Sequence, residues 1–104
     1  MIKLTILYPN ADGAHFDMDY YLQTHVPMSS QLLSPACKGY SVDEGVGGAP
    51  PGAPPPYLAI THLVFDSIEA FIAAFMPHAE ALQGDIPKFT NTQPIIQFSE
   101  IRLL

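Results

Sequence analysis

The chain has 104 residues, of which 48% are hydrophobic and 13% are charged, so it can build one domain with a real apolar core. Its formal net charge of −6, with only four Lys and Arg residues, argues against nucleic acid or an anionic membrane as a partner. The single Cys37 cannot form an internal disulfide, which is typical of a reducing compartment. Because no signal peptide or membrane span is evident either, we expect a cytoplasmic protein.

The first two predicted elements are a strand and a capped helix. Residues 2–8 alternate between two faces and are rich in β-branched side chains, which predicts a strand. Residues 9–13 have the composition of a turn. Asp17 then has the properties of a helix N-cap, and Phe16 and Tyr21 have the spacing of a hydrophobic staple across it.

Pro27 lies deep inside the pattern of this first helix. Proline removes one backbone hydrogen bond and pushes the preceding residue, Val26, away from the helical region. We therefore expect a kink or a stop just after His25. An apolar stretch continues to Leu33, and Ser34-Pro35 should end it.

Two strands and a loop follow. Residues 38–46 predict a weak strand, and residues 57–65 predict the strongest one, apolar on both faces and therefore central. Between them, nine of the twelve residues in 45–56 are Gly or Pro. Such a segment cannot hold a helix or a sheet ladder, so it predicts a flexible hairpin loop.

The C-terminal part predicts a second helix and a last strand. Asp66 or Ser67 should cap a helix with core-facing apolar residues, and Pro77 should stop or kink it. Three further segments are predicted: another helical turn or two at 78–83, a short capped turn at 85–91, and a last strand at 94–104.

The order of these elements is β-α-β-β-α-β. Two βαβ halves of this kind predict one ferredoxin-like α+β domain over residues 1–104, a four-stranded antiparallel sheet with both helices on one face. The helix-free face is too apolar for water, and the charged fraction is low for a lone domain of this size. Two sheets meeting face to face would cover it, so we expect a homodimer.

The sequence also resembles a known family. The pattern Phe16-Asp17-x-x-Tyr20-Tyr21-x-x-x-His25-x-Pro27, preceded by the first strand and followed by Asp85-Ile-Pro-Lys-Phe-Thr-Asn, is similar to the EthD family (ethyl tert-butyl ether degradation), of the dimeric α+β barrel group. The resemblance implies a homodimeric barrel with a small apolar pocket between the helices and the sheet of each subunit. The loop at 45–56 departs from the compact members. Relatives with this fold differ in chemistry, so the resemblance supports a pocket better than a reaction.

His25 is the main candidate for chemistry. On a helix, His25, Tyr21 and Asp17 form one row. In the functional interpretation, His25 transfers a proton to or from a small ligand while Tyr21 or Tyr20 positions it. In the structural interpretation, His25 binds a carbonyl freed by Pro27, and the tyrosines fill the core. Both interpretations remain open from the sequence alone.

His62 is the second candidate for catalysis. Alternation places it with Leu58, Ile60 and Val64 on one face of its strand, and it would share a pocket with His25 if that face meets the first helix. Tyr20, Tyr57 and Phe75 are the candidates for binding a substrate. The histidines lack metal-ligand spacing, so no metal or cofactor is predicted, and haem enters only by analogy with relatives.

Three functional hypotheses follow. The first is a cofactor-independent enzyme of the oxidoreductase, lyase or isomerase type, which uses histidine acid/base chemistry on a small oxygenated or aromatic catabolic intermediate. The alternative is a non-catalytic carrier or accessory protein of a degradation or polyketide pathway. The third is a purely structural dimer. The enzyme hypothesis requires that His25 reach a cavity and have a polar partner.

Overall fold

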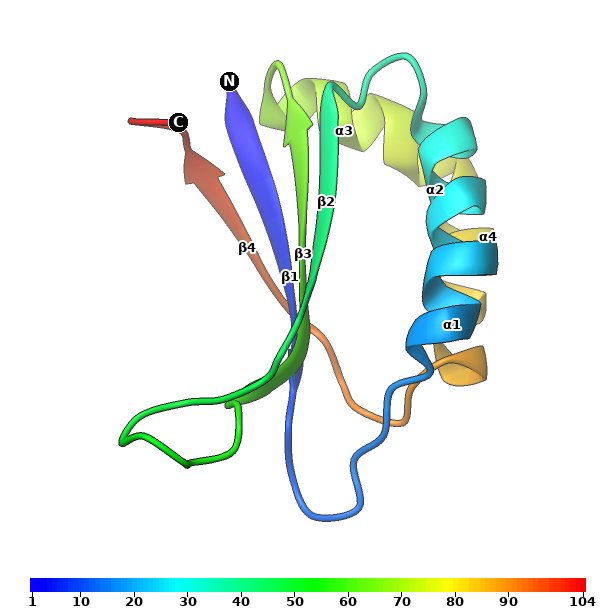
Figure 1. Ribbon diagram of the computed structural model, residues 1–104. Helices are drawn as coiled ribbons and strands as arrows, with labels where there is room; N and C mark the ends of the chain where they lie inside the picture. Colours follow the sequence, from blue (N-terminus) through cyan, green and yellow to red (C-terminus); the bar gives the residue numbers. More distant parts are fainter.

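Two antiparallel strands, β1 (Ile2–Pro9) and β3 (Tyr57–Phe65), form the centre of the sheet in the computed structural model, which describes all 104 residues (Figure 1). The strands β2 (Gly39–Glu44) and β4 (Ile95–Glu100) flank this pair, so the order is β2-β3-β1-β4 with every neighbour antiparallel. The predicted ferredoxin-like α+β fold is therefore confirmed, and β3 is central as expected.

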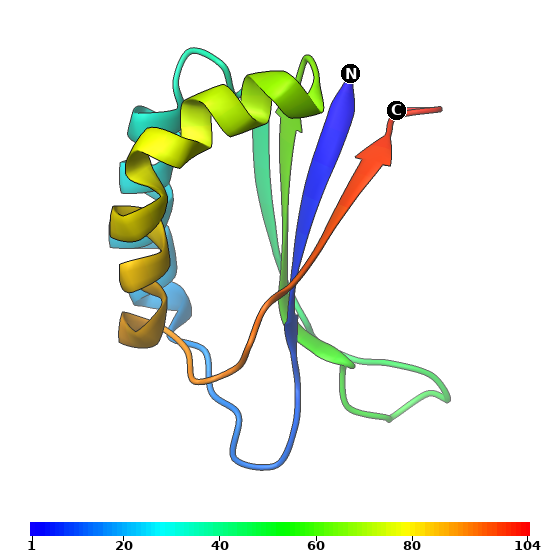
Figure 2. The same cartoon turned by 180° about the vertical axis from the view of Figure 1, so that it is seen from behind.

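The helices all lie on one side of the sheet (Figures 1 and 2). The first helical segment has three parts, α1 (Met18–Tyr20), the π-helical turn η1 (Tyr21–His25) and α2 (Val26–Leu33). The second has four parts, α3 (Ile68–Phe75), the 3₁₀ turn η2 (Met76–His78), α4 (Ala79–Gly84) and the 3₁₀ turn η3 (Ile86–Lys88).

The predicted helix caps are present. The Asp17 side chain accepts a hydrogen bond from the Tyr20 backbone N–H at 3.0 Å. Ser67, rather than Asp66, caps α3, because its Oγ accepts from the Ala70 backbone N–H at 3.0 Å. The Phe16 and Tyr21 rings contact each other with centroids 4.9 Å apart, as the staple pattern predicts.

A kink or a stop was expected just after His25, and the helix is irregular there but does not stop. The helix widens into the π turn η1, where the Val26 backbone N–H binds the Tyr21 carbonyl, and continues as α2 with Pro27 in its first turn. A π turn shifts the hydrogen-bonding pattern by one residue, so the missing proline N–H falls where the helix is already irregular. As a result, His25 lies inside a continuous helical segment rather than at a free end.

Pro77 bends the second helical segment as predicted. The 3₁₀ turn η2 contains Pro77 and separates α3 from α4, and the two helices run in clearly different directions (Figure 2). The last strand is shorter than the predicted 94–104. It ends at Glu100 because Glu100 pairs with Ile2, where β1 begins, so the next residues have no strand partner.

The two faces of the sheet have different surroundings. Buried residues of β1 and β3, such as Leu4, Leu63 and Phe65, pack with Leu33 of α2 and Leu82 of α4 to form the core. A second cluster joins the sheet to the first helical segment and contains Tyr8, Tyr21, Ala59 and Phe89. These two clusters leave a cavity between them and the helices, as described below.

The other face of the sheet carries no helix. Residues that alternate with the core set in β1, β3 and β4 point to this side and are only partly buried: Lys3, Thr5, Leu7, Ile60, His62, Val64, Ile95. The Gly/Pro segment 45–56 projects away from the helices as a long loop (Figures 1 and 2). None of the helices has the length and apolar character needed to cross a membrane.

Candidate functional site

A cavity of about 850 Å³ lies between the helical layer and the sheet. This volume is within the range of small-molecule sites in proteins, roughly 300–1,000 Å³. Its apolar wall comes from both helical segments and three strands: Leu4, Ile6, Leu33, Leu63, Phe71, Phe75, Leu82, Ile96, Phe98. No Lys, Arg, Asp or Glu lines the cavity, so it suits an uncharged or weakly acidic ligand.

His25 lies at the polar end of this cavity and is held by a carboxylate. Its Nδ1 is 2.9 Å from Oδ2 of Asp85, and both side chains are 9% exposed. The π turn carries His25, and Asp85 directly follows α4, so the pair joins the two helical segments. A buried carboxylate needs hydrogen-bond donors to offset the loss of water, and the His25 ring supplies one of them.

The other oxygen of Asp85 is also engaged. The Tyr20 hydroxyl donates to Oδ1 at 2.8 Å, and the Lys88 ammonium lies 3.8 Å from the same oxygen. Burial alone raises the pKa of Asp85, but the hydrogen bonds from His25 and Tyr20, with the charges of His25 and Lys88, outweigh it and hold this pKa below its ordinary value. Asp85 is therefore an ionised acceptor at neutral pH.

This arrangement fixes the state of the His25 ring. A carboxylate can only accept, so in the neutral ring the proton is on Nδ1 and the lone pair is on Nε2. Nε2 has no hydrogen-bond partner in the protein, and His25 is one of the residues that line the cavity. His25 thus presents a proton acceptor to the cavity.

Hydroxyl groups surround the same end of the cavity. The Tyr40 hydroxyl donates to Ser29 Oγ at 3.3 Å, and Thr90 Oγ1 donates to the His15 carbonyl at 2.7 Å. Burial raises the pKa of Tyr40 above its ordinary value, so it stays protonated and can donate at neutral pH. Tyr8, Ser29, Tyr40, Thr90 and Thr92 all line the cavity.

Tyr21, predicted as catalytic, is next to His25 but does not line the cavity. Its ring is fully buried and stacks on the His25 ring with centroids 5.3 Å apart. Its hydroxyl lies 2.7 Å from Thr61 Oγ1 on β3. Burial raises the pKa of Tyr21 above its ordinary value. Tyr21 therefore supports the His25 ring by packing against it.

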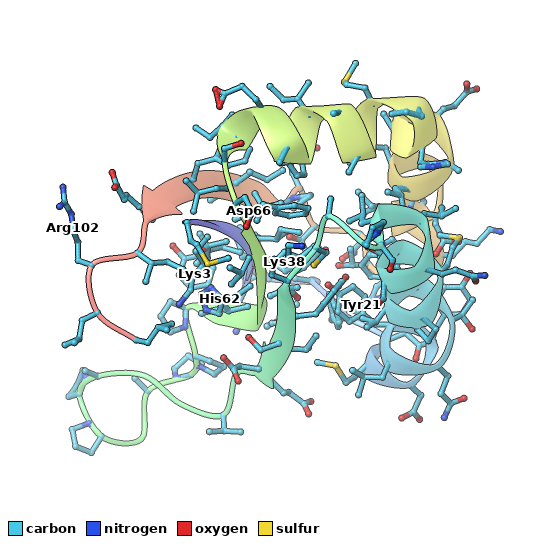
Figure 3. The ribbon with its side chains drawn as sticks, turned by 90° about the horizontal axis from the view of Figure 1, so that it is seen from above. Lys3, Tyr21, Lys38, His62, Asp66 and Arg102 are labelled. Atoms are coloured by element: carbon cyan, nitrogen blue, oxygen red, sulfur yellow. The ribbon has the colours of Figure 1, made fainter.

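His62 is separated from His25 by the sheet. It lies on the helix-free side of β3, where its Nδ1 is 2.9 Å from Thr5 Oγ1 (Figure 3). Tyr21 lies on the opposite side, toward the helices (Figure 3). The idea that His62 and His25 share a pocket is therefore corrected. The alternation of side chains in β3 turns Thr61 and Leu63 to the cavity side and His62 away from it.

The three predicted substrate-binding residues are in three different places. Phe75 lines the cavity and stacks on Phe71 with ring centroids 5.1 Å apart. Tyr20 does not line the cavity, and its hydroxyl supports Asp85, which raises the pKa of Tyr20 through their hydrogen bond. Tyr57 does not line the cavity either, because it lies at the start of β3, paired with Pro9.

Sequence reasoning did not select Asp85 as a site residue. One signal was present. Asp85 directly follows α4, where the negative end of the helix dipole disfavours an acidic side chain, so a compensating contact to its carboxylate is expected. Sequence reasoning also passed over Tyr8, Ser29 and Tyr40, which read as ordinary strand and helix residues. No group of three His, Cys, Asp or Glu side chains lies in an arrangement that could hold a metal ion.

The strand order and the helices on one face define a ferredoxin-like domain with the fold of the dimeric α+β barrel proteins. The family model described as the EthD domain matches residues 10–93, and the chain belongs to this family. No match is found among curated proteins.

Three solved structures illustrate the similarity. An EthD-like protein from Ralstonia eutropha is 39% identical, with a TM-score of 0.94 over 98% of this chain and 92% of that one. An EthD family protein from Bacillus halodurans is 22% identical, with a TM-score of 0.74 over 97% and 98% of the two chains. SnoaB from Streptomyces nogalater, described as a cofactor-independent oxygenase, is 11% identical, with a TM-score of 0.58 over 99% and 93%. At such low identity, the last two show the fold alone.

Proposed function

We propose that this protein is a cofactor-independent enzyme that moves a proton on a small, uncharged, oxygenated molecule in a catabolic or polyketide pathway. The observation that carries the proposal is the buried His25–Asp85 pair at the wall of the cavity, in which Nε2 of His25 has no partner within the protein. SnoaB, which has the same fold, is described as a cofactor-independent oxygenase, and this description motivates the proposal of a cofactor-independent reaction on a small molecule. The reaction itself is argued from the site, because a shared fold does not determine function.

The chemistry follows from the state of the His25 ring. Nε2 accepts a proton from a carbon next to a carbonyl of the bound molecule, which leaves an enolate and an imidazolium. The Asp85 carboxylate, already bound to Nδ1, stabilises the positive charge of this imidazolium. If the imidazolium proton is replaced by a proton from solvent water before it is returned to the same carbon, the result is proton exchange, and its return to another carbon is an isomerisation. Either outcome restores the neutral ring.

The apolar wall has its own part in this function. It excludes water from the carbonyl and the enolate, which strengthens every electrostatic interaction inside the cavity. Phe71, Phe75 and Phe98 form a connected aromatic surface, with ring centroids 5.1 Å apart for Phe71–Phe75 and 5.2 Å for Phe71–Phe98. Such a surface favours a flat aromatic or alicyclic ligand body.

The test is proton exchange into a simple enolisable ketone. We expect wild-type protein to accelerate deuterium uptake at the α carbons of 2-tetralone in D₂O, followed by NMR. His25→Asn should lose the protein-dependent rate by about 100-fold or more, since a positioned acid or base contributes roughly 10²–10⁴-fold. The matched control is His62→Asn, on the opposite face of the sheet, which should leave the rate unchanged.

A different outcome favours a carrier. If 2-tetralone binds but wild-type protein and His25→Asn exchange it at the same rate, the protein holds the molecule without catalysis. The position of His25 argues for the enzyme, since a carrier needs no histidine at its cavity.

We further propose that two copies pair through the helix-free face of the sheet. Leu7, Ile60 and Val64 lie there without a covering helix, and Ile95 is 50% exposed. The family fold supports this assembly. In sedimentation at low micromolar concentration, we expect about twice the mass of one chain, and a sole species of 11.3 kDa would refute the dimer.

A further inference from the structure

The hydroxyl of Tyr8 differs from those of the neighbouring tyrosines. Tyr21 and Tyr40 pair with Thr61 and Ser29, and Tyr20 donates to a carboxylate. The Tyr8 side chain is only 2% exposed, and the hydroxyl close to its own is that of Tyr21, which is already paired with Thr61. A tyrosine hydroxyl can donate one hydrogen bond as well as accept, so a partner from outside the protein is the natural complement of its O–H.

The contact with Tyr21 does not use the whole hydroxyl of Tyr8. The two hydroxyls lie close enough for a hydrogen bond that affects the pKa of both residues. The Tyr21 hydroxyl also lies 2.7 Å from Thr61 Oγ1, and each of these hydroxyls can both donate and accept. With Thr61 donating to Tyr21 and Tyr21 donating to Tyr8, the Tyr8 O–H is left free. Because Tyr8 lines the cavity, this O–H is available to a molecule bound there.

Tyr8 and His25 meet at the same end of the cavity. Both rings contact Phe89, with ring centroids 5.8 Å away for Tyr8 and 4.7 Å away for His25. The Tyr8 ring is also held edge-on by Phe16 and Tyr21, at 4.9 Å and 5.8 Å. Three aromatic neighbours of this kind leave Tyr8 little freedom, so its hydroxyl is positioned before a ligand arrives.

The chemistry of the cavity defines what Tyr8 would bind. Burial raises the pKa of Tyr8 to about 12, so the hydroxyl remains protonated at neutral pH and acts as a donor. No cationic side chain lines the cavity to bind a carboxylate or a phosphate. The complementary group is therefore an uncharged oxygen acceptor, such as a carbonyl, rather than an acid group.

We propose that Tyr8 donates a hydrogen bond to the carbonyl oxygen of the substrate and so restricts the site to ketones and related carbonyl compounds. This inference rests on the proposed function, because the same bond would strengthen as His25 removes the neighbouring proton and negative charge develops on the oxygen. Tyr8 would then act as an oxyanion donor opposite the His25 base.

The test compares two probes of the same shape, 2-tetralone and tetralin, which differ in the carbonyl group. NMR titration should show that Tyr8→Phe weakens the binding of 2-tetralone by about 3- to 10-fold, the value of one net hydrogen bond, and leaves tetralin unchanged. The control is Tyr57→Phe, which removes a hydroxyl at the start of β3 that does not line the cavity and should affect neither probe.

A second measurement needs no variant. With ¹³C-labelled 2-tetralone, the carbonyl resonance of the ketone bound to wild-type protein should lie downfield of its position in an apolar solvent, as a hydrogen-bonded carbonyl does. An unshifted resonance, or equal affinities of wild-type and Tyr8→Phe protein for 2-tetralone, would overturn the role of Tyr8 and leave the proposed function standing. If wild-type protein bound neither probe, both proposals would fail. If His25→Asn kept full exchange while Tyr8→Phe lost ketone affinity, the proposed function alone would fail.

Discussion

Replacing Asp85 with asparagine tests the central contact of the site. The substitution keeps the size of the side chain and removes its charge. Asp85 accepts hydrogen bonds from His25 at 2.9 Å and from Tyr20 at 2.8 Å. Asparagine has one carbonyl oxygen, so it can accept from His25 Nδ1 only if its amide group turns toward the Tyr20 hydroxyl. That hydroxyl can then accept instead of donating.

The magnitude follows from the loss of charge at these two bonds. A hydrogen bond to a charged group contributes about 1.5–3 kcal/mol to stability, and a neutral one contributes about 0.5–1.5 kcal/mol. The Tyr20 bond is partly exposed, and Lys88, with a 66% exposed side chain, adds little. We therefore expect Asp85→Asn to lower the free energy of unfolding by about 1–2 kcal/mol, which corresponds to roughly 5–15 °C in Tm for a domain of this size.

The assay is thermal unfolding at pH 7, followed by far-UV circular dichroism. Asp85→Ala should cost more, about 2–3 kcal/mol, because it leaves the N–H at His25 Nδ1 buried without an acceptor. The matched control is Asp12→Asn in the exposed loop after β1, which should change stability by less than about 0.5 kcal/mol. A Tm for Asp85→Asn within about 2 °C of wild type would refute the claim that the pair is charge-assisted and buried.

Two further predictions concern acid and the Gly/Pro loop. Because the pKa of Asp85 is lowered in the folded protein, its contribution to stability is fully present above its unfolded pKa and is lost as pH falls through the lower folded value. The Tm difference between wild type and Asp85→Asn should thus shrink below about pH 4, and a constant difference from pH 7 to pH 2.5 would contradict this. At the base of the loop, a Cβ on Gly45 would collide with the Tyr57 carbonyl oxygen, whereas Gly47 has only Ala53 O at 3.9 Å. Gly45→Ala should therefore cost about 1–3 kcal/mol in denaturant unfolding and Gly47→Ala clearly less, and equal costs would count against the tight contact at Gly45.

Local signals were enough for most elements of the fold. Asp17 and Ser67 cap helices through bonds to backbone groups three residues away, so the sequence near each cap contains the whole interaction. Proline acts equally locally, and Pro77 bends the second helical segment where the sequence predicts. Pro27 was harder to interpret, because a helix held on both sides by packing can absorb a proline in a π turn instead of ending.

Contacts between residues far apart in the chain could not be predicted from the sequence. Nothing near His25 shows that Asp85, sixty residues later, supplies its acceptor, because that contact depends on how α4 packs against the first helical segment. The end of β4 was also set by its partner, since the strand stops where β1 has no further residues to pair with.

The sequence by itself determined the alternating strands, the capped helices and their β-α-β-β-α-β order, because each depends on neighbours within one or two turns. Only the tertiary structure decided which face of the sheet His62 occupies, since an alternating strand fits either face equally well until it pairs. In the folded protein His62 points away from the cavity, Tyr21 lies in the core, Asp85 binds His25, and Tyr8 shares the contact with Phe89. The histidine proposed to act as the base was therefore a candidate from the sequence, and the groups proposed to act with it were not.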